Sequence, residues 1–494
     1  MKSIFLNLNR ANTRLFLSVF LVIIVSFLPS ACGSDDITDE PVPQTEEEKD
    51  WNTTDDDLQA TVVATQDMTL TDIVQRMINT GASGESLAHS YLVSHYREMG
   101  YDVSSNSSAA TGAKVSRISY QSVDANGNPV TLSALVAIPY GADGTAGSLK
   151  INSVLVGCHV TITHDKNSPW QWFDKETTSS VNDIGFYIAE ALTPAIVVCP
   201  DYMGYGVSKN ETHPYLIADQ TARNVYDAVV ASLNTCFFGA GNRMQDETWN
   251  IVFAGYSQGA AVALGTMRWM EKNNKMTAHI GGSFVGDGPY DPVATFQKYA
   301  ADGQISMPAA VALTYLGAKS AYPDLMSACN ENDVFTTQFV NTGIFDWISS
   351  KDITVGSISA RLKRSSAAGG IDGDFSIANI LSADMLDASS ATSQSFTTAL
   401  SRNRLTEDWQ PQHPILMFHS KADEVVPYVN AQNAMQAFAS SGQAKLKLIS
   451  GPTGLALTIM KIAGLSDGDN HSGNGTEFCY NLLSSETVGW RTLR

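Results

Sequence analysis

Positive charge is scarce in this sequence. The chain has 494 residues with 31 Lys and Arg against 50 Asp and Glu, so its formal net charge is −19 at pH 7. A surface of this sign repels phosphate groups, and the composition therefore argues against a nucleic acid as a partner. Acidity of this size usually serves solubility, so it carries no information about the charge of a substrate.

Cysteine is scarce as well, with six residues in the whole chain. Apart from Cys32, which belongs to the N-terminal segment described below, the cysteines form an odd set that cannot all pair with one another. They are Cys158, Cys199, Cys236, Cys329 and Cys479. Two of them, Cys158 and Cys199, lie in apolar runs of strand type, where a small buried thiol is the simplest interpretation. No spacing of cysteines or histidines is typical of a metal site, so we expect neither a metal nor a cofactor.

The apolar run near the N-terminus, Leu15 to Leu28, is too short to predict a membrane span. Basic residues precede it and small residues follow it, so residues 1–31 are predicted to be a signal peptide for export. The segment Leu28-Pro29-Ser30-Ala31-Cys32 resembles a bacterial lipobox, which implies that Cys32 is the lipidated first residue of a mature lipoprotein. The next residues, 33–36, resemble the export signal of surface lipoproteins of Bacteroidota, which implies an outer-membrane location on the cell surface or the periplasmic face. A plain secretory signal and an uncleaved anchor are the alternatives.

Residues 32–62 are predicted to form a flexible tether. From Asp35 to Asp57 the chain is acidic, contains proline and has almost no large apolar side chains, so it cannot bury enough surface to fold. Repulsion between like charges extends such a segment further. The tether would hold a folded domain away from the membrane to which Cys32 is anchored.

The clearest local pattern is the segment 251–259, an apolar run of strand type that ends in Gly255-Tyr256-Ser257-Gln258-Gly259. A run with helical periodicity follows it, from Ala261 to Met270. A strand, a tight turn and a helix are the context in which a Gly-x-Ser-x-Gly motif forms a nucleophile elbow. The two glycines fit, because side chains at either flank would collide with the neighbouring strand or helix. Ser257 is therefore the candidate nucleophile, and a surface serine in a glycine-rich turn is the alternative.

Strands and helices alternate along most of the chain. A strand hairpin is expected at 114–124 and 130–139, and further apolar strand-like runs are separated by segments with helical periodicity. These later runs occupy residues 154–158, 195–199, 251–256, 279–285, 414–419 and 444–449. The alternation predicts a mostly parallel sheet with helices on both faces, which is an α/β fold.

Residues 289–412 interrupt this rhythm. They lean towards helix, carry few strand signals and include polar stretches rich in Gly, Ser and Ala. We interpret them as an inserted helical cap, which in such folds usually shapes the substrate pocket. The two parts of the core are then residues 63–288 and 413–494.

A serine hydroxyl is a weak nucleophile at neutral pH and needs a base and an orienting acid. In α/β-hydrolases these partners follow the serine in the order acid, then histidine. We assign the acid to Asp423, in a turn after the expected strand 414–419, and Asp287, which follows the preceding strand, is the competing candidate. His471 is the only histidine after Asp423, so if this order holds it must be the base.

The oxyanion of a tetrahedral intermediate needs two backbone N–H donors. One is expected from Gln258, the residue after the nucleophile. The second is expected from the loop that follows the strand 154–158, and we assign it to Thr161, with Val160 as the alternative. His159 is interpreted as a structural histidine that closes this strand.

Several of these motifs together resemble the secretory lipase group of α/β-hydrolases over roughly residues 65–494. The motifs are Asp124–Gly127, Pro200–Gly206, Gly255–Gly259, Asp408–Pro411 and His419–Pro427. The resemblance implies an α/β-hydrolase fold with an inserted cap and the hydrolysis of carboxylic esters, often the acyl esters of lipids.

The first hypothesis is therefore a lipoprotein esterase or lipase that works through an acyl-enzyme. A serine peptidase or amide hydrolase of the same fold is the second, and a catalytically silent surface binding protein is the third. The expected partners are a small-molecule or lipid ester and a membrane reached through the N-terminal lipid. No oligomeric state follows from the sequence.

Overall fold

The computed structural model describes residues 51–69, 72–73, 76, 110–174, 183–245, 247–448, 471, 473–475 and 478. The expected signal peptide, Cys32 and Cys479 lie outside these residues. No helix among the residues described is long and apolar enough to cross a membrane.

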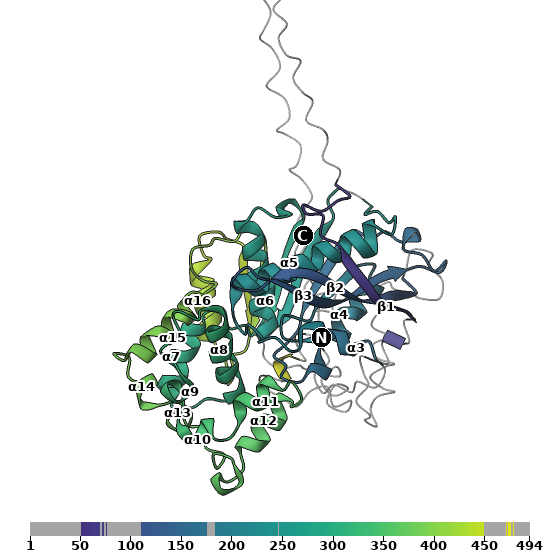
Figure 1. Cartoon of the computed structure of the whole chain (residues 1–494). Coiled ribbons are helices and arrows are strands. Elements are labelled where there is room, and N and C mark those ends of the chain that lie inside the picture. The colour runs from purple at the N-terminus through teal and green to yellow at the C-terminus, as the bar shows by residue number, and fades with distance from the viewer. Residues whose placement is uncertain are drawn as a thin grey trace, which may run out of the picture. The chain divides into compact units, whose positions relative to one another are not determined.

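Strands from both ends of the described chain form one sheet with the order β1-β2-β3-β5-β4-β6-β7-β8-β9 (Figure 1). The strands are β1 (Ala60–Thr69), β2 (Gly112–Val123), β3 (Pro129–Tyr140), β4 (Ser153–Cys158), β5 (Ile196–Pro200), β6 (Asn250–Tyr256), β7 (Ile280–Gly286), β8 (Ile415–His419) and β9 (Ala444–Leu448). The first three strands and β5 pair antiparallel, whereas every pair from β5 to β9 is parallel. The predicted mostly parallel sheet is confirmed.

Both faces of this sheet are covered, and β4, β5 and β6 are therefore buried along their whole lengths. One face carries α5 (Ala218–Ser232), α6 (Gln258–Lys272) and α16 (Val429–Ala437), whose apolar residues join one core cluster. The other face carries α3 (Pro169–Trp172) and α4 (Asp183–Ala189) in a second cluster. In a parallel sheet the carboxyl ends of the strands share one edge, so the turns after β4, β6, β7 and β8 meet there.

Short helices fill the chain between β7 and β8 and lie beside the sheet in Figure 1. They are α7 (Pro292–Asp302), α8 (Pro308–Ala321), α9 (Glu331–Val334), α10 (Thr337–Val340), α11 (Ile344–Ser349), α12 (Val355–Leu362), α13 (Ile377–Ile380), α14 (Ala383–Leu386) and α15 (Ala391–Ser401). This insertion, which we call the cap, has an apolar core of its own around Tyr315, Phe335 and Phe339.

The expected tether ends earlier than residue 62, because residues 51–62 pack on the core. Trp51 and Leu58 lie against the main apolar cluster, and β1 pairs with β2 from Ala60 onwards. The acidic residues of this stretch are also engaged: Asp56 accepts a hydrogen bond from Tyr226 and pairs with Lys275 at 2.9 Å. These contacts could not be predicted from composition. An acidic side chain that meets a specific hydrogen-bond donor can be part of a folded region, and composition does not show which donors it will meet.

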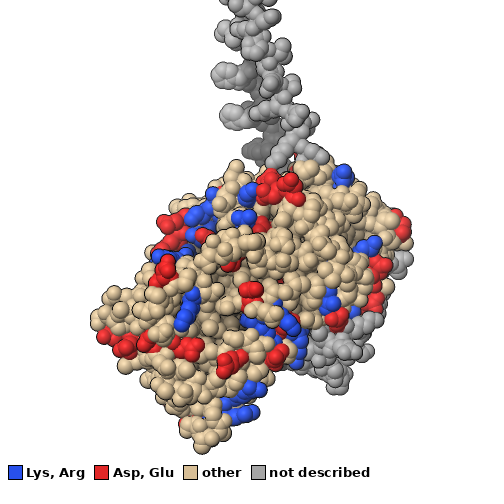
Figure 2. Space-filling view, in the orientation of Figure 1, with Lys and Arg blue, Asp and Glu red and all other residues tan. Residues whose placement is uncertain are grey.

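Basic and acidic side chains are intermixed on the face shown in Figure 2. Among the described residues the free cysteines are Cys158, Cys199, Cys236 and Cys329. Cys158 and Cys199 are fully buried on β4 and β5, as the apolar context of both predicts.

Candidate active site

Ser257 lies in the tight turn between β6 and α6, with φ 55° and ψ −123°. This backbone conformation is strained for a residue with a side chain, and the two flanking glycines make room for it. A Cβ on Gly255 would lie 2.1 Å from the carbonyl oxygen of Gly259. A Cβ on Gly259 would lie 2.0 Å from the carbonyl oxygen of Cys158. The glycines are therefore required because backbone approaches backbone on both sides of the serine.

The structure brings Ser257, His471 and Asp423 together. The Nε2 atom of His471 lies 2.9 Å from Ser257 Oγ, and its Nδ1 atom lies 2.6 Å from Asp423 Oδ2. Because a carboxylate only accepts, Nδ1 donates to Asp423 and leaves Nε2 free to accept the serine proton. All three residues are buried, with 5 to 7 % of their surface exposed. The competing acid, Asp287, does not occupy this position beside His471.

The turn after β8 stabilises Asp423 as a carboxylate. Its Oδ1 atom accepts hydrogen bonds from the backbone N–H groups of Val425 and Val426, at 2.8 and 2.7 Å. Burial opposes the charge, but the charge of a protonated His471 and the hydrogen bonds outweigh it, so the pKa of Asp423 is lowered from its ordinary value. A carboxylate held in this way can orient the imidazole and stabilise an imidazolium.

The backbone of His471 is held from two sides. Its N–H donates to both carboxylate oxygens of Glu424, at 3.3 and 3.2 Å. Its carbonyl oxygen accepts a hydrogen bond of 2.9 Å from the hydroxyl of Tyr256, the residue before the serine. Neither contact was predicted from the sequence, although Glu424 and Tyr256 are the immediate neighbours of the predicted site residues Asp423 and Ser257.

The loop after β4 reaches the N-terminus of α6, where the oxyanion donors were expected. In the described part of the chain, the backbone N–H groups of Gln258 and Thr161 have no acceptor within hydrogen-bond reach. The N–H of Val160, by contrast, donates to Asp183 at 2.9 Å. Thr161 is fixed through its side chain, whose Oγ1 lies 2.9 Å from the hydroxyl of Tyr215.

Two buried histidines support this loop and α6 without contacting Ser257. His159 stacks on Tyr202 with ring centroids 4.0 Å apart, and burial lowers its pKa to about 4. His213 donates from Nδ1 to the carbonyl of Met203 and accepts from Gln258 Nε2 at 2.7 Å. Burial lowers the pKa of His213 to about 3, so it is neutral at pH 7. Sequence reasoning missed the contact with Gln258, because no local pattern connects residues 45 positions apart.

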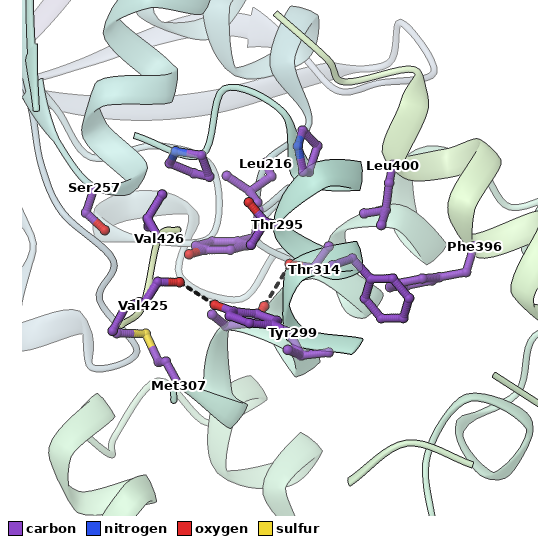
Figure 3. Close-up of a pocket in the computed structure, with 16 residues that line it drawn as sticks. Leu216, Ser257, Thr295, Tyr299, Met307, Thr314, Phe396, Leu400, Val425 and Val426 are labelled. Carbon is purple, nitrogen blue, oxygen red and sulfur yellow. Dashed lines mark hydrogen bonds between the residues drawn. The ribbon is translucent and has the colours of Figure 1, made fainter. Parts of the chain in front are cut away.

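A pocket beside Ser257 extends into the cap. Its lining comes mainly from α7, α8 and α15, and the described residues that line it include no charged side chain. Figure 3 shows Ser257 at one side of this space and Phe396 and Leu400 of α15 at the opposite side. The pocket can therefore take an apolar chain whose reacting end meets the serine hydroxyl.

The turn that holds Asp423 also lines the pocket. The side chains of Val425 and Val426 line the pocket (Figure 3), while their N–H groups bind Asp423. The hydroxyl of Tyr299 on α7 donates to the carbonyl oxygen of Val425. The cap is thus tied directly to the turn that carries the acid.

Among the residues described, one buried group could hold a metal ion: Asp287, His419 and Asp423, with one ligand atom from each within 4.8 Å of the others. Both oxygens of each carboxyl are already hydrogen-bonded to protein groups. A cation would have to displace the bond between Asp423 and His471 or those that hold it in place. The cluster is better explained as support for the contact between Asp423 and His471.

The family model described as secretory lipase matches residues 174–453. No protein in the curated set matches this chain. Among solved structures, a ligand-bound rice cell wall degrading esterase LipA from Xanthomonas oryzae has a TM-score of 0.61 at 19% identity, covering 88% of this chain and 99% of its own. Lipase A of Candida antarctica has a TM-score of 0.50 at 14% identity, with 78% and 75% covered. At these identities the structures show a shared fold, which is that of the α/β-hydrolases.

Proposed function

This chain belongs to the secretory lipase family and is a carboxylic ester hydrolase, and from this premise we propose that it is a serine esterase that works through an acyl-enzyme. One observation carries the proposal: His471 lies within hydrogen-bond distance of both Ser257 Oγ and Asp423 Oδ2. Serine, imidazole and carboxylate in this order form a catalytic triad, in which the imidazole takes the serine proton and the carboxylate orients the imidazole.

In the proposed reaction, His471 Nε2 takes the proton of Ser257 Oγ as that oxygen attacks the acyl carbon. The imidazolium that forms is stabilised by Asp423 and then protonates the leaving alcohol. Water, activated by the same imidazole, next attacks the acyl-enzyme and releases the carboxylic acid. The serine is regenerated, so no cofactor is consumed.

The N–H groups of Gln258 and Thr161 are the proposed donors to the oxyanion. Their lack of another acceptor in the described structure supports this assignment, whereas the N–H of Val160 is already bound to Asp183. Such donors stabilise a charge that exists only in the transition state, and each typically contributes about 3 kcal/mol. Their support from His213 and Tyr215 keeps both groups in place before the substrate arrives.

The proposed substrate is an ester with an apolar acyl group. The described residues that line the pocket beside Ser257 offer apolar side chains and a few hydroxyl groups, and none of them is charged. This lining favours a hydrocarbon chain, and its described residues include no charged group to bind the terminus of a peptide. It therefore supports an esterase over the peptidase alternative, and the assembled triad supports catalysis over a silent binding protein.

We also propose that the enzyme is exported as a lipoprotein anchored through Cys32. Membership of a secretory family supports export, and the segment around Cys32 supports the lipid anchor. Cys32→Ala tests this: the enzyme should move from the membrane fraction to the soluble fraction while keeping its specific activity. Retention of the variant in membranes would contradict the lipid anchor.

The proposed chemistry is tested with p-nitrophenyl esters of increasing acyl length, alongside labelling by a fluorophosphonate. Wild type should hydrolyse the esters and become labelled at Ser257. Ser257→Ala should lose both properties, because the residual rate without the triad is typically lower by about 10⁶-fold. Cleavage of peptide amides but not esters would instead support the peptidase alternative, and an unlabelled, inactive wild type would support the binding protein.

A further inference from the structure

The hydroxyl of Tyr256 lies between two oxygen atoms. It is 2.9 Å from the carbonyl oxygen of His471 and 2.7 Å from Oδ2 of Asp287. A tyrosine hydroxyl has one proton, and a carbonyl oxygen can only accept. If Tyr256 donates to His471, the short contact with Asp287 requires a proton on Asp287.

The other contacts of Asp287 fit a carboxylic acid with its proton on Oδ2. Its Oδ1 atom accepts the backbone N–H of Ser420 at 2.9 Å, as a carbonyl oxygen would. Its Oδ2 atom can donate to Tyr256 and still accept from Asn474 Nδ2 at 3.2 Å. Every polar atom of this neutral group then has a partner, as buried polar groups require.

No cation neutralises Asp287 among the groups described around it. The titratable groups that face it are Tyr256, Tyr290, His419, Asp423 and His471. His419 donates from Nε2 to the carbonyl of Val426 at 2.9 Å, and its buried Nδ1 atom has no hydrogen-bond partner. Burial lowers the pKa of His419, so this ring is neutral and leaves a lone pair 3.8 Å from Asp287 Oδ1.

Asp423 gives a second reason for the proton. An oxygen of each carboxyl lies within 4.8 Å of the other, and two buried negative charges at this separation repel strongly. Asp423 is held as a carboxylate by His471 and two N–H groups. Burial, and then the charge of Asp423, accordingly raise the pKa of Asp287 well above its ordinary value.

We propose that Asp287 is a neutral carboxylic acid which donates a hydrogen bond to Tyr256, and that Tyr256 in turn donates to the carbonyl of His471. This relay rests on the proposed triad function of His471. Asp287 acts as a positioning residue: it fixes the direction of the Tyr256 hydroxyl and thereby the backbone that carries the base. It also adds no further negative charge beside Asp423.

The relay predicts a change in activity at alkaline pH. Once Asp287 loses its proton, Tyr256 turns its hydroxyl to the carboxylate and no longer binds the carbonyl of His471. The base loses one of its two backbone contacts, and a second charge appears beside Asp423. We therefore expect kcat of the wild type to fall on the alkaline side as Asp287 ionises.

Asp287→Asn is the matched test, because its amide can donate to Tyr256 and accept from Ser420 but cannot ionise. At neutral pH its kcat should fall by no more than about fivefold, and the alkaline fall due to Asp287 should disappear. Asp287→Ala, which leaves Tyr256 and Ser420 without this partner, should lose about 100-fold, the order expected for unpaired buried groups. A loss of 100-fold or more in folded Asp287→Asn, or equal losses in the two variants, would overturn the proposal.

Infrared difference spectra give a readout that does not depend on activity. At neutral pH the wild type minus Asp287→Asn should show the C=O stretch of a protonated carboxylic acid, and carboxylate bands in its place would overturn the proposal. Failure of the triad assignment would be recognised separately, because Ser257 would then resist fluorophosphonate labelling while the carboxylic acid band persisted.

Discussion

The backbone of Gly259 lies so close to Cys158 that a methyl group on the glycine would come within 2.0 Å of the carbonyl oxygen of Cys158. The two residues belong to neighbouring elements, since Gly259 is in the first turn of α6 and Cys158 is the last residue of β4. Their contact sets the separation between the serine turn and the loop that carries Thr161.

Gly259→Ala is therefore expected to push these two elements apart. We expect kcat/KM to fall by at least about 100-fold, because misplacement of reacting groups by about 1 Å has effects of this size. Ester hydrolysis and thermal unfolding of the purified variant would measure the effect. Gly265→Ala is the control on the same helix: its new methyl group would lie 3.6 Å from Leu405, and the change should stabilise the protein by about 0.5–1 kcal/mol. Equal behaviour of the two variants would contradict the close-contact explanation.

Replacing Thr161 with proline removes the N–H that we assign to the oxyanion. Thr161→Pro should lower kcat by about 10² to 10³-fold, the loss typical of one oxyanion donor. Thr161→Ala keeps the N–H and loses only the contact with Tyr215, so it should lose less than about 10-fold, as one neutral hydrogen bond would. Circular dichroism would verify folding in both. A folded Thr161→Pro with normal kcat would place the second donor elsewhere.

A larger side chain at Leu400 should shorten the acyl chain that the pocket accepts. Leu400→Trp is expected to reduce kcat/KM for a dodecanoyl ester at least about 10-fold relative to a butanoyl ester, because the far wall would occupy the space of the last methylene groups. Leu386→Trp is a suitable control, since Leu386 is on the cap but 41% exposed. An unchanged preference in Leu400→Trp would show that the acyl chain lies elsewhere.

Lys351 is buried at the junction of cap and core, 4.8 Å above the ring of Tyr205. Burial lowers its pKa from 10.5 to about 8. Between about pH 8 and pH 10.5, Lys351 carries a proton in the unfolded chain but not in the folded protein. The free energy of unfolding therefore rises with pH in this range, and Lys351 contributes about 1–3 kcal/mol to the rise. Lys351→Met should remove that rise and stabilise the protein at pH 7.

Urea denaturation of wild type and Lys351→Met between pH 7 and pH 10.5 would measure this difference. Lys298→Met serves as the control, since the side chain of Lys298 is 48% exposed and its removal should leave the slope unchanged. Parallel pH dependences for wild type and Lys351→Met would contradict the burial argument.

The serine turn was predictable because its signal is local. The Gly-x-Ser-x-Gly motif and its flanking strand and helix are contiguous, and the structure forms them where they were expected. His471 is predicted as the base by elimination along the chain order, and its Nε2 atom lies 2.9 Å from Ser257 Oγ.

The sequence favours Asp423 as the acid but does not exclude Asp287. Both follow neighbouring parallel strands, β8 and β7, and so reach the same edge of the sheet. Only the path of the C-terminal segment decides which of them the imidazole meets. The packing of residues 51–62 was missed for a related reason, because acidic composition is informative about solubility but not about specific partners such as Lys275 and Tyr226.

The double use of the turn at Val425 and Val426 constrains how this enzyme can diversify. A change there that suits a new acyl group also disturbs the two N–H groups on which the acid depends, so preference and turnover would shift together. Helix α15 carries Phe396 and Leu400 without touching the acid. Natural variation in chain preference should therefore accumulate on α15, leaving the valine turn almost unchanged.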